Sequence, residues 1–186
     1  MAKISEEQIF AVTRDLIAEK GPAGVRLTDI ARRLDVTHAA LYKHFKNRDA
    51  LYEAMYTQWL DQVDAPSLAI TRLPADQRVD GLHEWLQNFV IQRQQAFMAD
   101  PEMASLYQTA LRQEMELINP RIAQLSETVE TLMAWDTFRH QRGMLIMMAF
   151  TYLYHPFFVD KWNDNLYMPL FESTWLELLP VINNIN

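Results

Sequence analysis

Apolar residues recur with a helical period along almost the whole chain. Between residues 9 and 17 they return every three or four positions, the spacing of one helix face. Ser5 and Gln8 have the spacing of a capping box at the start of this helix, and Gly21 followed by Pro22 predicts its end. Strand-like alternation is scarce, and there are only 4 Gly. The chain is therefore predicted to be all-α.

The same periodicity predicts about nine helices. Pro66 and Pro74 bracket a loop after the fourth helix, and "DPE" at 100–102 ends the fifth. The predicted ranges are 5–20, 27–34, 38–45, 48–64, 76–99, 102–117, a helix that starts after Asn119, 136–159 and 167–183.

Two short helices joined by a tight turn lie between residues 27 and 45. The first cannot be stable alone, because isolated helices of fewer than about 12 residues are marginal in water. Val36 is expected to anchor the turn in the core, Thr37 to cap the second helix, and Asn47 to cap the helix that follows. Leu41 and Phe45 form the inward pair of that helix, so small and polar residues face outward. This is a helix-turn-helix, which can place a recognition helix in the major groove of DNA.

Charge is distributed unevenly along the chain. The formal net charge is −7, yet residues 26–48 hold six basic and two acidic residues, a net charge of +4. Residues 57–186 hold eight basic and sixteen acidic residues, a net charge of −8. A cationic patch on an acidic protein suits phosphate contact, and the acidic remainder limits nonspecific binding. Each basic residue alone is typical of a solvated helix face, but together with the two-helix spacing they favour DNA binding.

The stretch "IARRLDVTHAALYKHFKNRDAL" resembles the DNA-binding region of TetR-type transcriptional repressors. The pattern of that family runs roughly I-A-x-x-x-G-V-S-x-x-x-L-Y-x-H-F-x-x-K-x-x-L, with Thr37 standing here for the Ser and Arg48 for the Lys. The resemblance includes the first helix, whereas the later chain agrees with the family only in length and helical content. The matching residues are Ile30, Ala31, Val36, Leu41, Tyr42, His44, Phe45 and Leu51.

The resemblance implies roles for individual residues. Tyr42 and His44 would donate to phosphates, Thr37 would combine cap and phosphate contact, and Arg48 would meet the DNA backbone. Residues at the start of the recognition helix would contact the base edges. There, alanine methyls can contact thymine methyls, and His38 can hydrogen-bond a purine. The residues expected at DNA are Arg26, Thr28, Thr37, His38, Ala39, Ala40, Tyr42, Lys43, His44, Lys46 and Arg48.

Two positions depart from the family pattern. Arg26 stands where the family usually has a Thr that starts the second helix, so the side-chain cap is lost there. Asp35 replaces the usual turn Gly, but Asp tolerates the left-handed conformation better than most residues. We therefore expect the turn to form, at some electrostatic cost near phosphate.

The segment "GMLIMMAFTYLYHPFFV" is apolar all round, which predicts burial on both faces. Since a helix of a monomer this size faces its own body on one side only, we expect a second copy of the chain on the other side, with the last helix completing a four-helix interface. A fully internal helix in a monomer is the alternative. The expected interface residues are Met147, Phe150, Tyr154, Phe158, Leu170, Trp175, Leu178 and Leu179.

The later helices are rich in Met and aromatic residues, which suit a site for varied apolar ligands but equally an ordinary core. Arg93 lies on an apolar stripe and must be paired if buried, either by Glu114 or by an acidic ligand. An apolar carboxylate would suit the second case; without Arg93 available, the acidic body would favour lipophilic cations. The expected ligand residues are Phe89, Arg93, Tyr107, Met144, Met148, Tyr152 and His155.

Pro156 leaves the carbonyl of Tyr152 without its helical donor. This acceptor, next to His155, would meet a ligand or a water, or it would mark only a kink.

Several classes of protein and site are not expected. Zero cysteines exclude disulfides and thiolate zinc sites, and no enzyme motif, cofactor fingerprint or membrane-length apolar run is present. The pairs Asp136–His140 and Asp80–His83 lack a third metal ligand and are more typical of helix surfaces. We expect a cytoplasmic protein that has no cofactor, no catalytic activity and no membrane partner.

These patterns predict a helix-turn-helix DNA-binding domain at 1–47 and a helical regulatory domain for ligand binding and dimerisation at 48–186. The expected function is a ligand-responsive repressor whose homodimer binds a near-palindromic double-stranded operator and is released by a small, largely apolar effector. The alternative is an all-α protein-interaction module whose helix-turn-helix is only structural.

Overall fold

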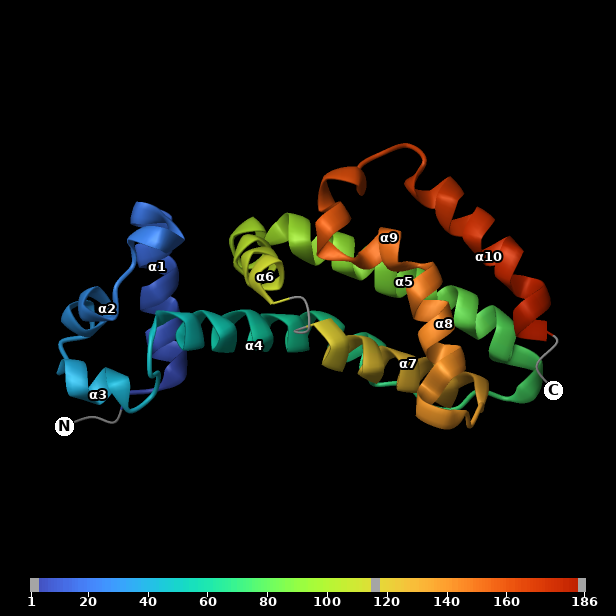
Figure 1. Ribbon diagram of the computed structural model, residues 1–186, viewed down its shortest axis with the longest axis horizontal. Helices are drawn as coiled ribbons and strands as arrows, with labels where there is room; N and C mark the ends of the chain where they lie inside the picture. The colour runs from blue at the N-terminus through green and yellow to red at the C-terminus, as the bar shows by residue number, and fades with distance from the viewer. Residues whose placement is uncertain (1–3, 115–117, 184–186) are drawn as a thin grey trace. The chain divides into compact units, whose positions relative to one another are not determined.

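The computed structural model describes residues 4–114 and 118–183. Within these ranges every regular element is an α-helix or a short 3-10 helix, which confirms the predicted all-α class. The chain divides into two compact units, Met1–Trp59 and Leu60–Asn186, and the division falls inside α4 (Arg48–Leu68). In Figure 1 the first unit begins in blue and the second ends in red. The predicted functional boundary, between residues 47 and 48, is the start of α4.

The N-terminal unit consists of α1 (Glu6–Gly24), α2 (Leu27–Arg33), α3 (His38–Tyr42) and the first part of α4. Leu41 and Phe45 are buried, as their spacing predicts, and the Phe45 ring lies 5.9 Å from that of Phe10 on α1. Because its inward residues are held in this core, the short helix α3 keeps its opposite face toward solvent.

Side chains close the helix starts where the sequence predicts caps. Ser5 and Gln8 form the capping box of α1. The Thr37 hydroxyl accepts from the backbone N–H three residues on at 3.2 Å, and the Asn47 side chain does the same at the start of α4 at 2.8 Å. The start of α2, where Arg26 stands, has no side-chain cap.

Two residues with positive φ shape the connections of this unit. Gly21, with φ of +73°, breaks the helical path at the predicted stop, but Pro22 starts a further turn that carries α1 to Gly24. Asp35 has φ of +52°, so the turn before α3 forms with Asp in the left-handed region, as expected.

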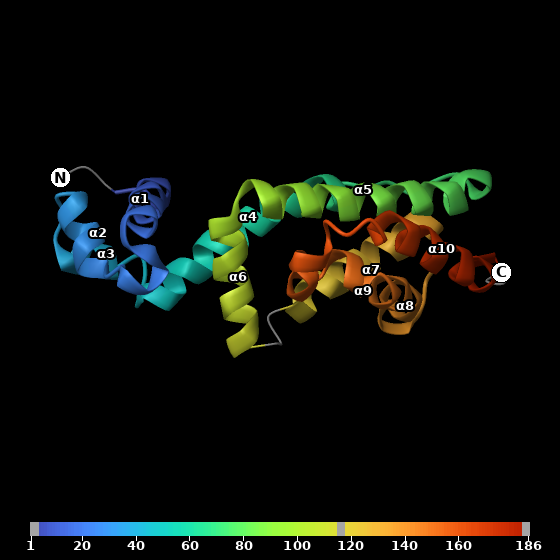
Figure 2. The same cartoon turned by 90° about the horizontal axis from the view of Figure 1, so that it is seen from above.

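The C-terminal unit is arranged around α5. Figure 2 shows α5 along one side of this unit, with α7, α8, α9 and α10 on the other. The helix α4 ends four residues later than predicted, because Pro66 lies in its last turn and Ala69 N–H still donates to the Ala65 carbonyl. Of the helix predicted for 102–117, residues 115–117 lie outside the described ranges. The elements are η1 (Ala75–Gln77), α5 (Arg78–Ala99), α6 (Pro101–Gln113), α7 (Asn119–Met133) and α10 (Tyr167–Asn183).

The single helix predicted for 136–159 is wrong. Pro156 causes one break, because proline lacks the N–H and pushes the preceding residue, His155, into an extended conformation. A second break lies at Phe150, so the described ranges hold ten α-helices instead of nine. The segment forms η3 (Phe138–His140), α8 (Gln141–Ala149), α9 (Thr151–Tyr154) and η4 (Pro156–Lys161).

The helices α7 and α8 pack with their backbones in direct contact. A Cβ atom on Gly143 would lie 2.0 Å from the carbonyl oxygen of Ser126, so a larger residue would force the helices apart. Glu130 on α7 is buried and accepts from the backbone N–H groups of Thr137, Arg142 and Gly143 at 3.1 to 3.3 Å. Burial opposes its charged form, but these hydrogen bonds prevail and lower the pKa of Glu130. Glu130 thus caps the start of α8 from the neighbouring helix.

Among the described residues, the helices are too short or too polar for any of them to cross a membrane.

Candidate nucleic-acid interface and effector site

The helix α3 carries four of the eleven residues predicted to contact DNA, and Lys43 follows it directly. His38, Ala39, Tyr42 and Lys43 are exposed, and Ala40 is half-buried. The rings of His38 and Tyr42 meet edge to face with centroids 4.5 Å apart, so each ring restricts the other on the exposed face of α3. Arg26, Thr28, Thr37 and Lys46 are also exposed, whereas His44 and Arg48 are half-buried.

The basic residues of this region differ in how they are neutralised. Arg33 donates to both carboxylate oxygens of Glu19 at 2.8 Å, and Arg32 lies 3.8 Å from Asp29. Across residues 4–114 and 118–183, no carboxylate lies within ion-pair distance of Arg26, Lys43 or Lys46. These three cations therefore remain available for an external anion.

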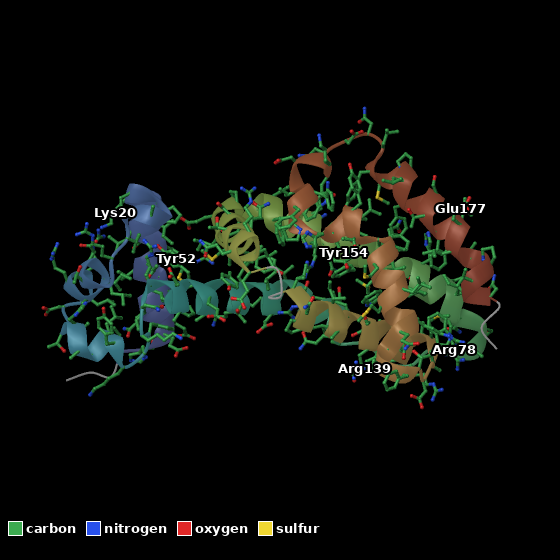
Figure 3. All side chains as sticks on the ribbon, in the orientation of Figure 1. Lys20, Tyr52, Arg78, Arg139, Tyr154 and Glu177 are labelled. Carbon is green, nitrogen blue, oxygen red and sulfur yellow. The ribbon has the colours of Figure 1, made fainter. Side chains whose placement is uncertain are left out.

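Arg48 already has contacts within the N-terminal unit. Its guanidinium donates to the Ala23 carbonyl at 3.2 Å and lies over the Tyr52 ring, 5.7 Å from its centroid. Tyr52, labelled in Figure 3, in turn donates to a backbone carbonyl of α1. Its acceptor is the Pro22 carbonyl, at 2.8 Å. Arg48 thus ties the start of α4 to the end of α1, a role that the sequence pattern did not reveal because its partners are backbone atoms 25 residues away.

Two comparisons of sequence concern this unit. Residues 9–55 match the family model described as bacterial regulatory proteins, tetR family. An HTH-type transcriptional repressor of Mycobacterium tuberculosis is 40% identical over 47 residues, which are 25% of this chain and 25% of that protein. The transposon Tn10 TetC protein of Escherichia coli is 36% identical over 63 residues, 34% of this chain and 32% of that protein. The chain thus spans only about a quarter to a third of the length of these relatives.

Solved structures share the fold over nearly the whole chain. The fatty acid degradation regulator FadR of Bacillus halodurans has a TM-score of 0.56 at 16% identity, covering 94% of this chain and 96% of that one. A transcriptional regulator of the TetR/AcrR type from Aquifex aeolicus has a TM-score of 0.51 at 16% identity, covering 95% and 98%. At such identities the likeness concerns the fold alone. The sequence match to the tetR family thus covers residues 9–55, and the described fold as a whole is like that of the solved regulators.

Outside the TetR-family match, the predicted ligand residues are not all brought together. Phe89, Arg93, Tyr107 and His155 are buried, and Tyr152 is half-buried. Met144 and Met148 are 39% and 60% exposed on α8 and do not belong to the buried group. The Tyr152 carbonyl accepts from Trp162 Nε1 at 3.2 Å, so the acceptor left by Pro156 is occupied within the chain.

Arg93 pairs with Asp64 of α4, and not with Glu114, which is exposed. Its Nε and Nη2 donate to the two carboxylate oxygens at 2.9 and 2.7 Å, and both side chains are almost fully buried. Burial opposes the charge of Arg93, but the ion pair prevails and raises the pKa of Arg93. A ligand carboxylate is therefore not required. Asp64 lies four residues after the buried Leu60, on the same face of α4. A charged residue on an apolar helix face was also the signal that predicted a buried Arg93, so the same signal could have identified Asp64.

The residues predicted for a dimer interface divide into two groups. Met147, Phe150, Tyr154 and Trp175 are buried inside the protomer, so they are not available to a partner, contrary to expectation. Met147, Phe150 and Tyr154, from the segment 141–154, and Trp175, from α10, belong to the core of the C-terminal unit. Leu170 is exposed, and Phe158, Leu178 and Leu179 are half-buried.

The two histidine pairs considered as metal ligands have other partners. His83 Nε2 lies 3.0 Å from Glu172 on α10, and His140 Nδ1 lies 3.3 Å from Glu130. Within the part of the chain that the structure describes, no group of three potential metal-binding side chains is found.

Proposed function

We propose that this protein is a transcriptional repressor that binds a near-palindromic operator as a homodimer and releases it when a small, largely apolar effector binds. The observation that carries the proposal is the face of α3. His38 and Tyr42 are exposed on α3, Lys43 follows it directly, and Arg26 and Lys46 are exposed elsewhere in the same unit, on a chain whose net charge is −7. An anionic partner suits this face, and a helix-turn-helix suits the major groove.

Contacts with DNA would follow two kinds of chemistry. Phosphates would be met by Thr37, Tyr42, His44 and the basic residues Arg26, Lys43, Lys46 and Arg48, which position the protein without reading sequence. Base edges would be read by His38, Ala39 and Ala40, with Thr28 reaching from α2.

Dimerisation is supported by the exposed apolar side chains of the C-terminal unit. Most of the large apolar residues that the structure leaves exposed belong to α8, α10 and the residue before α10. Exposed apolar surface of this kind marks interaction sites. In a two-fold symmetric dimer, the same apolar surface of each protomer would be buried against its partner. The residues proposed for this interface are Met144, Leu145, Met148, Leu166, Leu170, Leu176 and Val181, with half-buried Leu178 and Leu179.

Release would follow from linkage. An effector weakens DNA binding only if it prefers a dimer whose two recognition helices are wrongly spaced for the half-sites. The predicted regulatory region, residues 48–186, would contain both the effector site and the dimer interface.

Selection of DNA from a random pool by the purified protein tests the proposal. We expect enrichment of a near-palindromic sequence whose half-sites are one helical turn, about 34 Å, or a multiple of it apart. Failure to enrich any sequence, at salt low enough to retain phosphate contacts, would favour a protein-interaction module instead.

A further inference from the structure

The centre of the C-terminal unit holds a charge-balanced cluster of two arginines and two aspartates. Asp64 accepts from Arg93 and also lies 3.3 Å from Nε of Arg121 on α7, whose side chain is 12% exposed. Arg121 also donates to Asp61, whose carboxylate is largely exposed to solvent. The two arginines and two aspartates balance, and each is already paired, so neither an anionic nor a cationic guest has an unpaired charge to meet at this place.

Tyr154, on α9, presents a polar atom to this centre. Its side chain is 1% exposed, and Figure 3 shows it in the interior of the unit. The Arg93 guanidinium lies 5.8 Å from the centre of its ring, and the Phe89 ring 5.3 Å. Burial raises the pKa of Tyr154, against the influence of Thr151 and Arg93, so the phenol keeps its proton.

The Tyr154 hydroxyl is buried without a hydrogen-bond partner in the described residues. The Thr151 hydroxyl, which acts to lower the pKa of Tyr154, donates to the Met147 carbonyl at 3.4 Å and does not meet the Tyr154 hydroxyl in hydrogen-bonding geometry. A buried hydroxyl without a partner is costly, and such groups are rare in native proteins unless a water or a ligand completes them.

His155, next along the chain, is a second buried polar side chain under the influence of Arg93. Its Nδ1 accepts from the Phe157 backbone N–H at 3.2 Å, so the neutral ring carries its proton on Nε2. Burial, reinforced by Arg93, lowers the pKa of His155, which keeps the ring neutral. Neither Tyr154 nor His155 therefore offers a charge to a guest.

We infer that the effector is a small apolar molecule with an uncharged hydrogen-bond acceptor, such as a ketone, ester or amide carbonyl, and that the Tyr154 hydroxyl donates to this acceptor. The inference rests on the proposed effector response and replaces both effector classes expected from the sequence. An apolar carboxylate finds Arg93 already paired with Asp64, and a lipophilic cation finds Asp64 already paired with Arg93 and Arg121.

The hydroxyl is tested first without any ligand. Tyr154→Phe should raise the melting temperature, because it removes an unpaired buried polar group without changing the ring. Tyr167→Phe is the matched control, since its hydroxyl is equally buried but donates to the Leu153 carbonyl, and this variant should melt lower. If Tyr154→Phe melts lower as well, the hydroxyl is already bonded to a buried water and the inference fails.

The acceptor is tested with four probes of the same number of non-hydrogen atoms: acetophenone, cumene, 1-phenylethylammonium and benzoate. In NMR titrations of the full chain, acetophenone should bind about tenfold more tightly than cumene, as expected for one buried hydrogen bond, and more tightly than either charged probe. Tyr154→Phe should abolish the preference for acetophenone over cumene. Equal binding of acetophenone and cumene by the wild type, or tighter binding of a charged probe, would overturn the inference.

Operator binding separates this inference from the proposed function. Tyr154→Phe should bind the selected DNA with wild-type affinity, because the substitution lies in the C-terminal unit and leaves α3 unchanged. A wild-type protein that binds operator but shows no acetophenone preference refutes the effector chemistry alone. A wild-type protein that binds no operator refutes the proposed function.

Discussion

Thr37 stabilises the start of a helix that has only five residues. Its hydroxyl accepts from the backbone N–H of Ala40, and loss of such a cap typically costs about 1 kcal/mol. We expect Thr37→Ala to lower the free energy of unfolding by about that amount in denaturant titrations. Thr28→Ala, at an exposed position of α2, is the control and should change it by less than about 0.5 kcal/mol. Equal effects of the two substitutions would show that the Thr37 cap contributes nothing.

Arg93 and Asp64 form the most completely buried ion pair described. Removing one partner leaves an unpaired buried charge, so Arg93→Met should lower the free energy of unfolding by about 3–5 kcal/mol. The double variant Arg93→Met with Asp64→Leu should regain much of this loss, because apolar pairs of similar size often replace buried ion pairs without cost. Denaturant unfolding of both variants measures the difference, and a double variant less stable than the single one would contradict the account.

At the residue scale, local chemistry could be predicted and distant pairing could not. Ser5, Thr37 and Asn47 cap helices as predicted, and Asp35 takes the left-handed conformation, because each signal involves neighbours within three residues. The Arg93–Asp64 pair joins residues 29 positions apart. The sequence therefore predicted that a buried Arg93 must have a partner, but it did not predict that the partner is Asp64.

Among the elements, α8 depends most clearly on a side chain from another helix. Glu130 is deprotonated in the fold with a pKa lowered from its ordinary value of 4.5. Its stabilising effect is therefore complete above about pH 4.5 and is lost as the pH falls through the lower folded-state pKa.

Glu130→Gln should lower stability near neutral pH and flatten the loss of stability on acidification, measured by denaturant unfolding from about pH 7 to about pH 3. Glu127→Gln, exposed on the same helix, is the matched control and should keep the wild-type slope. An acid-induced loss that is as steep in Glu130→Gln as in the wild type would exclude Glu130 as its source.

Periodicity predicted the helices α1 to α7 well but failed for 136–159. The apolar pattern there is continuous, and helical propensity gives no warning of the break at Phe150. Pro156 did give a local warning of the second break. Since the chain turns there, residues expected on an outer face, such as Met147 and Tyr154, lie in the core, and Leu145 is left exposed.

For the whole molecule, the exposed face of α8 makes a prediction about assembly. Leu145 is 49% exposed, so Leu145→Asp should fold normally but bury an unpaired charge in the proposed interface. Sedimentation should show a wild-type dimer at micromolar concentration and a monomeric variant. Met98→Asp, 55% exposed on α5, is the control and should stay dimeric. A monomeric wild type, or a Leu145→Asp variant that remains dimeric, would count against this interface.

The salt dependence of operator affinity tests the central proposal most directly. The logarithm of the binding constant should fall linearly with the logarithm of salt concentration, and Lys43→Ala should reduce that slope by about 1 for each phosphate that Lys43 neutralises. Arg33→Ala, in the same unit but with its guanidinium engaged by Glu19, should leave the slope unchanged. A slope that Lys43→Ala does not alter, or that Arg33→Ala reduces equally, would contradict the assignment of the α3 face as the DNA-binding surface.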